Sequence, residues 1–273
     1  MSVTVHRDGP VGVIRLDRAE VRNAVDRPTA DALRAAVEEL DADEHLAAIV
    51  LSGSGGTFCA GADLHALEDP ERRNELLREL RGPMGPTRST TRLPTIAAIE
   101  GYAVAGGLEL ALWCDLRVVA QHAVLGVFCR RVGVPLIDGG TVRLPRLVGL
   151  GVALDLILTG RPVGAEEAHR IGLANRVVAD GTAEAAAIAL GQELARWPQR
   201  TLRSDLAAAR SAFDRPLAAA LLHEHDLGVA SLAAGGAQEG VAAFRAGAGR
   251  HGRGDDLGAP GAGERDAPGA GGS

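Results

Sequence analysis

The feature that most constrains this chain is a set of short, continuous apolar runs, each separated from the next by glycine-rich or helix-like segments. The runs are residues 47–51, 95–99 and 116–120. Continuous rather than alternating apolar strands are typical of parallel sheets covered on both faces. A helical stretch opened by Pro28, and another over residues 106–114, supply crossovers of the kind that parallel strands require. The pattern therefore predicts an α/β domain with largely parallel pairing.

Two further segments have patterns of their own. Polar and apolar residues alternate over residues 3–16 around Asp8, Gly9 and Pro10, which predicts a β-hairpin. The charged stretch 69–92 is expected to be helical with a break near Gly82 and Pro83.

The second half of the chain changes character after about residue 139, where helical patterns dominate. We expect a core domain over residues 1–190 and a helical region, suited to oligomer contacts, over residues 191–247. Residues 248–273 are glycine, alanine, proline and charge without periodicity, which predicts a disordered tail.

The composition excludes several classes of function. A net charge of −6 and an aromatic content of 3% argue against nucleic acid as the main partner, and the charge also argues against an anionic membrane. The sequence contains no lysine, which excludes P-loop phosphate transfer and Schiff-base chemistry. Scattered cysteines, no apolar signal core and no run near the ~20 residues of a membrane span predict a cytoplasmic protein.

Two glycine-containing segments, residues 57–64 and 101–110, each lead from a strand toward a helix. Small residues let backbone N–H groups approach a ligand, and helix N-termini favour negative charge. Two such N–H groups converging on one oxygen would form an oxyanion hole able to stabilise a thioester enolate. Glu109 lies about one helical turn after Gly106, so its carboxylate can face the same pocket. Such turns are also common in α/β proteins generally, and Glu109 could equally be a surface residue.

These segments resemble the two signature loops of the crotonase (enoyl-CoA hydratase/isomerase) superfamily, and the likeness extends over residues 3–246. The resemblance implies a crotonase-type fold, with a repeated ββα spiral core and a C-terminal helical layer. Further motifs follow the family's order and spacing at residues 18–24, 139–144, 158–161, 165–168 and 172–175.

The resemblance also implies roles for individual residues. The N–H groups of Ala62 and Gly106 would be the oxyanion donors, and Glu109 would be a catalytic carboxylate. Since lysine is absent, arginine must meet the phosphates of coenzyme A, and Arg22 is the best candidate, although it could also be a solvated loop residue. The contacts implied for the coenzyme A thioester are Arg22, Ala24, Ala60, Asp63, Leu64 and His65.

The chain departs from the family pattern at one catalytic position. A hydratase of the family uses two glutamates that hold the attacking water between them, and Cys129 stands where the second is expected. Either Arg130 and Arg131 lower the pKa of the thiol, or Cys129 is an ordinary buried or pocket-wall cysteine. Asp138 is the obvious substitute carboxylate, but it could instead cap the helix that follows it. The sequence leaves these alternatives open.

The leading hypothesis is a lyase of the enoyl-CoA hydratase type in fatty acid metabolism, which adds water to a 2-enoyl-CoA. The alternative is an enoyl-CoA double-bond isomerase that uses Glu109 as its single acid/base, and a non-catalytic crotonase-fold binding protein is a third reading. No cofactor is expected beyond the coenzyme A of the substrate, and no metal, since His223 and His225 do not share a helix face. The resemblance implies a homotrimer or a dimer of trimers.

Overall fold

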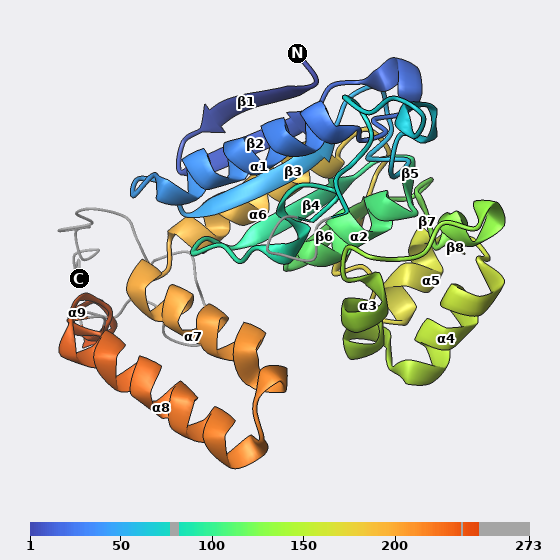
Figure 1. Cartoon of the computed structure of the whole chain (residues 1–273). Coiled ribbons are helices and arrows are strands. Elements are labelled where there is room, and N and C mark those ends of the chain that lie inside the picture. The colour runs from blue at the N-terminus through green and yellow to red at the C-terminus, as the bar shows by residue number, and fades with distance from the viewer. Residues whose placement is uncertain (77–81, 236, 246–273) are drawn as a thin grey trace, which may run out of the picture. The chain divides into compact units, whose positions relative to one another are not determined.

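The computed structural model describes residues 1–76, 82–235 and 237–245. Contacts divide the chain into two compact units, residues 1–195 and residues 196–273, which are coloured by residue number in Figure 1. The expected boundary between residues 190 and 191 falls inside one helix, α6 (Ala183–Ala195), and the expected tail 248–273 lies outside the described residues. No helix in the described ranges combines the length and apolarity needed to cross a membrane.

The first unit is built on a six-stranded sheet in the order β1-β2-β3-β4-β6-β9. The hairpin predicted for the N-terminus is confirmed, since β1 and β2 pair antiparallel, and every other pair in the sheet is parallel. The runs predicted at 95–99 and 116–120 are strands with those bounds. The strands are β1 (Val3–Asp8), β2 (Val11–Leu16), β3 (Ala48–Gly53), β4 (Thr95–Ile99), β6 (Leu116–Ala120) and β9 (Arg176–Val178).

Helices cover both faces of this sheet, which explains why its central strands are apolar throughout. A Cβ on Gly12 of β2 would meet Leu40 of α1 (Arg27–Ala42), whereas Gly191 of α6 packs on the side chain of Val11. Neighbouring residues of a strand point to opposite faces, so α1 and α6 lie on opposite sides of the sheet. Figure 1 shows α1 in front of the blue strands and α6 behind them.

A second, three-stranded sheet has the order β5-β7-β8, with β5 (Tyr102–Val104) parallel to β7 (Val124–Gly126) and β7 antiparallel to β8 (Val163–Gly164). Gly101, with φ +51°, makes the tight turn from β4 into β5. Cys59 forms an isolated parallel bridge with Ala103, so the first glycine loop runs along the outer edge of β5.

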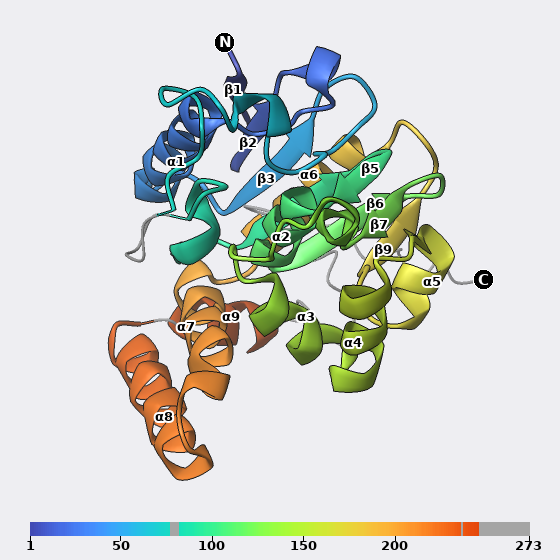
Figure 2. The same cartoon turned by 45° about the vertical axis from the view of Figure 1, so that its right-hand side comes forward.

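The short helix α2 (Gly106–Trp113) follows β5 and is buried on nearly all sides. It packs against β5 and against α3 (Gly140–Val148), as Figure 2 shows. Helices α4 (Leu150–Thr159) and α5 (Ala165–Arg170) complete this side of the unit. α2 thus lies between the sheet edge and the segment that follows β7.

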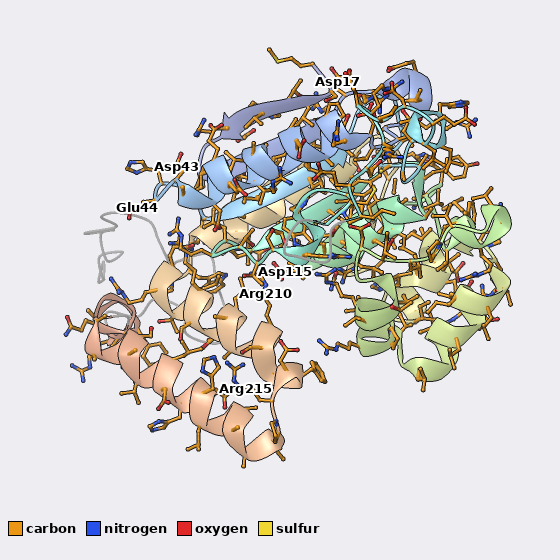
Figure 3. The ribbon with its side chains drawn as sticks, viewed as in Figure 1. Asp17, Asp43, Glu44, Asp115, Arg210 and Arg215 are labelled. Atoms are coloured by element: carbon orange, nitrogen blue, oxygen red, sulfur yellow. The ribbon has the colours of Figure 1, made fainter. Side chains whose placement is uncertain are left out.

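A buried arginine supports the C-terminal end of α2. Arg117 of β6 is 1% exposed and is the largest fully buried side chain of the described residues. Asp115, labelled in Figure 3, lies in the turn between α2 and β6. The guanidinium donates to the carbonyls of Leu173, Ala111, Cys114 and Asp115 and to Asn175 Oδ1. A cation at this end of a helix complements the helix dipole.

The helix expected over residues 69–92 is wrong for the described part of that stretch. Residues 69–76 form turns and coil, and residues 82–92 contain only a bridge between Gly82 and Gly85 and a 3-10 turn, Pro86–Arg88. The positive φ of Gly85 (+92°) and the prolines exclude a continuous helix here. Residues 77–81 lie outside the described residues.

The second unit contains three helices in its described part: α7 (Gln199–Ser211), α8 (Leu217–Ala233) and α9 (Gln238–Arg245). α7 packs along α8, and Gly240 of α9 approaches Pro198 at the start of α7.

Candidate active site

The first glycine loop presents an unpaired backbone amide. Ala62 forms a parallel bridge with Val25, in which Val25 N–H donates to Gly61 O at 2.8 Å and Asp63 N–H donates to Val25 O at 2.9 Å. Successive N–H groups of an extended chain point to opposite sides, so Ala62 N–H points away from Val25. It has no hydrogen-bond acceptor among the described residues.

The second glycine loop presents another backbone amide, at the start of α2, for which the described residues supply no acceptor. Ala105 enters the helix with φ 52° and ψ −125°, a conformation that residues with a Cβ rarely adopt. Its carbonyl accepts from Leu108 N–H at 3.0 Å and from Glu109 N–H at 3.2 Å. Because N–H and C=O point in opposite directions across a trans peptide, Gly106 N–H points out of the helix. Amides of the first helical turn have no acceptor within the helix.

The two loops are in direct contact. A Cβ on Gly61 would lie 3.0 Å from both Gly106 N and Ala105 Cβ, so glycine is needed here, and the positive φ of Gly61 (+104°) also favours it. On its other side Gly106 packs on Met84, whose Sδ would lie 2.8 Å from a Cβ at that position. Two unpaired amides at touching loops can bind one partly negative oxygen, as the sequence analysis expected of Ala62 and Gly106.

Glu109 is buried in the first turn of α2, with 3% of its surface exposed, and is not a surface residue. Its Oε1 accepts from Asp138 N–H and from Gly140 N–H, both at 2.8 Å. Among the described residues no donor is bonded to Oε2, which is free to exchange a proton with a ligand. Burial raises the pKa of Glu109 to about 7; the amide of Gly140 opposes the shift and the charge of Asp138 adds to it. A carboxyl with this pKa can both accept and return a proton near neutral pH.

Asp138 is also buried, with 3% exposed, and its carboxylate is already engaged. Its Oδ1 accepts from Met84 N–H at 3.0 Å and from the Thr87 hydroxyl. Burial raises the pKa of this carboxyl as well, against the hydrogen bonds from Thr87 and Met84. The N-cap residue of α3 is Gly139, and no side chain accepts a hydrogen bond from the first amides of that helix as a cap. The helix-cap alternative for Asp138 is therefore wrong. The side chain connects the segment around Met84 to the turn beside Glu109.

Cys129 lies in the 3-10 helix Phe128–Val132, with 5% of its surface exposed. Burial and the charge of Glu109 raise the pKa of its thiol, although the charge of Arg130 opposes them. The thiolate alternative is therefore contradicted. The Arg131 guanidinium instead stacks 3.6 Å from the Phe128 ring centroid. The position expected for a second glutamate therefore holds a neutral thiol, which cannot act as a carboxylate.

Behind the first oxyanion loop lies a network of four charged side chains, here called the ion quartet: Arg18, Asp26, Asp63 and Arg72. Arg18 bonds Asp63 at 2.9 Å and lies 3.4 Å from Asp26. Arg72 bonds both carboxylates at 3.0 Å. Asp63 is 2% exposed, so its carboxylate supports the loop from inside rather than meeting coenzyme A directly.

The other residues expected to contact coenzyme A lie together at the rim of this loop. Ala60 N–H donates to Arg22 O at 3.0 Å, and Ala24 lies between Arg22 and the Val25 bridge. The side chains of Arg22, Leu64 and His65 are exposed, which leaves them accessible to a large ligand. The structure thus brings Arg22, Ala24, Ala60, Leu64 and His65 to one edge, beside Ala62.

Comparisons with known proteins identify the family of this chain. The family model described as Enoyl-CoA hydratase/isomerase matches residues 6–246. A curated relative, "Probable enoyl-CoA hydratase echA8" of Mycobacterium bovis, is 36% identical over 243 residues, which are 89% of this chain and 94% of that protein. "Enoyl-CoA isomerase/hydratase claC" of Penicillium crustosum is 41% identical over 181 residues, 64% of this chain but 20% of that protein.

Among solved structures, the enoyl-CoA hydratase EchA1 from Mycobacterium marinum matches with a TM-score of 0.85 and 33% identity, over 90% of this chain and 96% of that one. The chain belongs to the enoyl-CoA hydratase/isomerase (crotonase) family. It has the α/β crotonase fold with C-terminal helices, as the sequence predicted, and its family implies an acyl-CoA substrate.

Several residues of the site were missed by the sequence analysis. Met84 and Thr87 lie in the stretch expected to be a helix, and Arg143 was noted only as part of a motif. The sequence contained one local signal for Arg143. Asp138 is followed directly by two glycines and, three residues after them, by Arg143, which indicates a tight turn with a cation nearby. Met84 and Thr87, which this turn contacts, are about fifty positions away in sequence, and nothing in their local sequence indicates the contact.

Proposed function

We propose that the protein is an enoyl-CoA hydratase that adds water to a 2-enoyl-CoA, with Glu109 as its acid/base. The observation that carries the proposal is the Glu109 carboxyl: one oxygen is held by two backbone amides, the other is free, and the pKa is about 7. The amides of Ala62 and Gly106 belong to two loops that touch at the start of the same helix, which supports a common site. The names of several relatives, which read enoyl-CoA hydratase or probable enoyl-CoA hydratase, support the same reaction.

In the proposed mechanism the thioester oxygen binds between Ala62 N–H and Gly106 N–H. Glu109 takes a proton from a water molecule while the water oxygen bonds to the β-carbon, and the electron pair of the double bond moves to the thioester as an enolate. The two amides stabilise the enolate oxygen. Protonated Glu109 then returns its proton to the α-carbon, which completes the addition of one water.

A second candidate, the isomerisation of a 3-enoyl-CoA, is favoured by a specific observation. Cys129 is a neutral thiol where a second glutamate is expected, and Oδ1 of Asp138 is engaged by Met84 and Thr87, which favours a reaction that uses Glu109 as its single acid/base. Isomerisation needs no held water: Glu109 would remove the α-proton, and the dienolate would accept that proton at the γ-carbon.

The test is liquid chromatography with mass spectrometry of coenzyme A thioesters after incubation of the protein with 2-enoyl-CoA and 3-enoyl-CoA of short and long chain length, since the two isomers have equal mass and are separated by retention time. Gain of one water, lost in Glu109→Gln, supports hydration. Conversion of the 3-enoyl to the 2-enoyl isomer without gain of water supports isomerisation instead. No reaction, together with tight thioester binding, would favour the non-catalytic binding protein.

The same proposal includes a cytoplasmic location, a part in fatty acid metabolism and assembly as a homotrimer or a dimer of trimers. Light scattering of the purified protein tests the assembly. A monomer would remove the oligomer from the proposal without affecting the chemistry.

A further inference from the structure

The turn that holds Glu109 is itself held from its other side by one arginine. Arg143 Nη1 donates to Asp138 O at 2.9 Å, while Asp138 N–H donates to Glu109. One residue of the turn therefore connects the two charged side chains through its N–H and its C=O. A Cβ on Gly139 would clash with the guanidinium, and Gly139 has φ +97°, so the turn is built to let Arg143 approach.

Arg143 also reaches the segment that contacts the oxyanion loop. Its Nη2 donates to Thr87 O at 2.6 Å, and the Thr87 hydroxyl donates to the Asp138 carboxylate. Arg143, Thr87 and Asp138 thus close a ring of hydrogen bonds between two segments that are about fifty positions apart in sequence. Within this ring the guanidinium donates to two carbonyls. The planar, forked geometry of arginine suits this arrangement, and the ammonium group of lysine does not.

The charges around Glu109 give Arg143 a second effect. The groups facing Glu109 are Asp138, Arg143 and the Cys129 thiol, and Asp138 in turn faces Arg88 and Arg143. Arg143 lowers the pKa of both carboxyls. Burial lowers the pKa of Arg143 itself, against the charges of Glu109 and Asp138.

We propose that Arg143 is a positioning residue for Glu109. It holds turn 138–140 through the carbonyls of Asp138 and Thr87, so that the two amides of the turn stay on Glu109 Oε1, and its charge favours the ionised form of Glu109. The inference rests on the proposed role of Glu109 as acid/base, and it does not depend on which reaction Glu109 performs.

The test follows Glu109 directly, by carbon-13 NMR of protein labelled at its glutamate carboxyls, with the Glu109 resonance assigned as the one lost in Glu109→Gln. In Arg143→Met the titration midpoint of Glu109 should move to higher pH, because a nearby positive charge is removed. Where activity is measurable, kcat should fall about 10- to 100-fold with little change in KM, as expected when a reacting group is misplaced. Arg143→Lys should titrate close to wild type but have a lower kcat.

The control is Arg170→Met, which removes an exposed arginine from α5 and should leave the titration of Glu109 and kcat unchanged. A folded Arg143→Met protein with an unmoved Glu109 midpoint would overturn the proposal. If Arg143→Met does not fold, Arg143→Lys decides: a reduced kcat at constant KM supports the role, and a wild-type kcat contradicts it. A wild-type protein inactive on every thioester would refute the proposed function and still leave the titration to decide this one.

Discussion

The two halves of the site are supported by different kinds of charge cluster. Behind the first oxyanion loop, the ion quartet has two arginines for two aspartates, so its charge is balanced. Around Glu109, the guanidinium of Arg143 donates to backbone carbonyls and not to the two buried carboxyls, Glu109 and Asp138, which it and Arg88 affect only through their charge. The first cluster fixes a backbone, whereas the second leaves a carboxyl that is incompletely compensated.

The difference is visible in the pKa values. Burial alone would raise the pKa of Asp26, but hydrogen bonds from Thr29 and Arg72 lower it below its usual range. For Glu109 burial prevails and the pKa rises to about 7. Balanced buried charges stabilise a structure without titrating near neutral pH, and an unbalanced one is suited to proton transfer. The quartet therefore supports the fold, whereas the Glu109 cluster has the charge balance that the proposed proton transfer requires.

The strongest test of this distinction is Glu109→Gln. The amide side chain retains an oxygen for the two turn amides but cannot carry a proton between substrate atoms. We expect kcat to fall about 10³-fold, the range of general acid–base catalysis. Turnover of the thioester that proves to be the substrate measures it, and retention of more than a tenth of wild-type activity would place the acid/base elsewhere.

The second test breaks the quartet with Arg18→Met. Removing one partner leaves the buried carboxylates of Asp26 and Asp63 undercompensated, which should reduce the free energy of unfolding by about 3 kcal/mol. Urea denaturation measures it. The matched control is Arg7→Met, which removes an arginine paired at 3.1 Å with Asp43, at the end of α1 in Figure 3, and should cost much less because Arg7 is largely exposed. Equal losses in both variants would contradict a special role for the quartet.

The third test uses pH. The pKa of Glu109 is raised in the folded state from an ordinary value near 4.5 to about 7, so ionising it opposes folding. The stability tied to this group is complete below about pH 4.5 and is lost as pH rises to about 7. Glu109→Gln removes that loss and should be more stable than wild type by about 2 kcal/mol at pH 8, with no gain at pH 4. Thermal unfolding at both pH values gives the result, and a gain independent of pH would argue against the raised pKa.

The smallest expected effect separates the two interpretations of Asp138. Asparagine keeps an oxygen for Met84 N–H and the Thr87 hydroxyl, so Asp138→Asn should lose about 1 kcal/mol of transition-state stabilisation or less, roughly fivefold in kcat/KM. Its acidic pH limb should move to lower pH, because the Asp138 charge raises the pKa of Glu109. Asp138→Ala, which removes the acceptor, should be weaker than Asp138→Asn. An inactive asparagine variant would instead make Asp138 a second catalytic acid.

Much of the fold was predictable because it rests on local pattern. The apolar runs at 95–99 and 116–120 are strands with those bounds, since buried parallel strands need apolar residues on both faces. Glu109 could also be singled out, because a carboxylate in an otherwise apolar helix turn needs a partner or a function.

The rest depends on contacts between distant segments. Residues 69–92 carry a helix-like density of charge, but Arg72 is used by the quartet and Gly85 needs a positive φ, so tertiary contacts prevail over local preference. The engagement of Asp138 by Met84 and Thr87 joins positions about fifty residues apart. Sequence could propose a second carboxylate there, but only the fold shows what its oxygen bonds.

Arg117 lies at the end of α2 remote from Glu109, and its charge bears on how the titrations in this helix are interpreted. Burial lowers the pKa of Arg117, but its guanidinium donates to carbonyl oxygens, and an arginine in a protein stays protonated near neutral pH. The end of α2 remote from Glu109 therefore carries a constant charge. A pH-dependent signal near neutral pH from the interior of this helix therefore reports Glu109 and the Asp138 carboxyl beside its first turn, while the charge at its other end does not change.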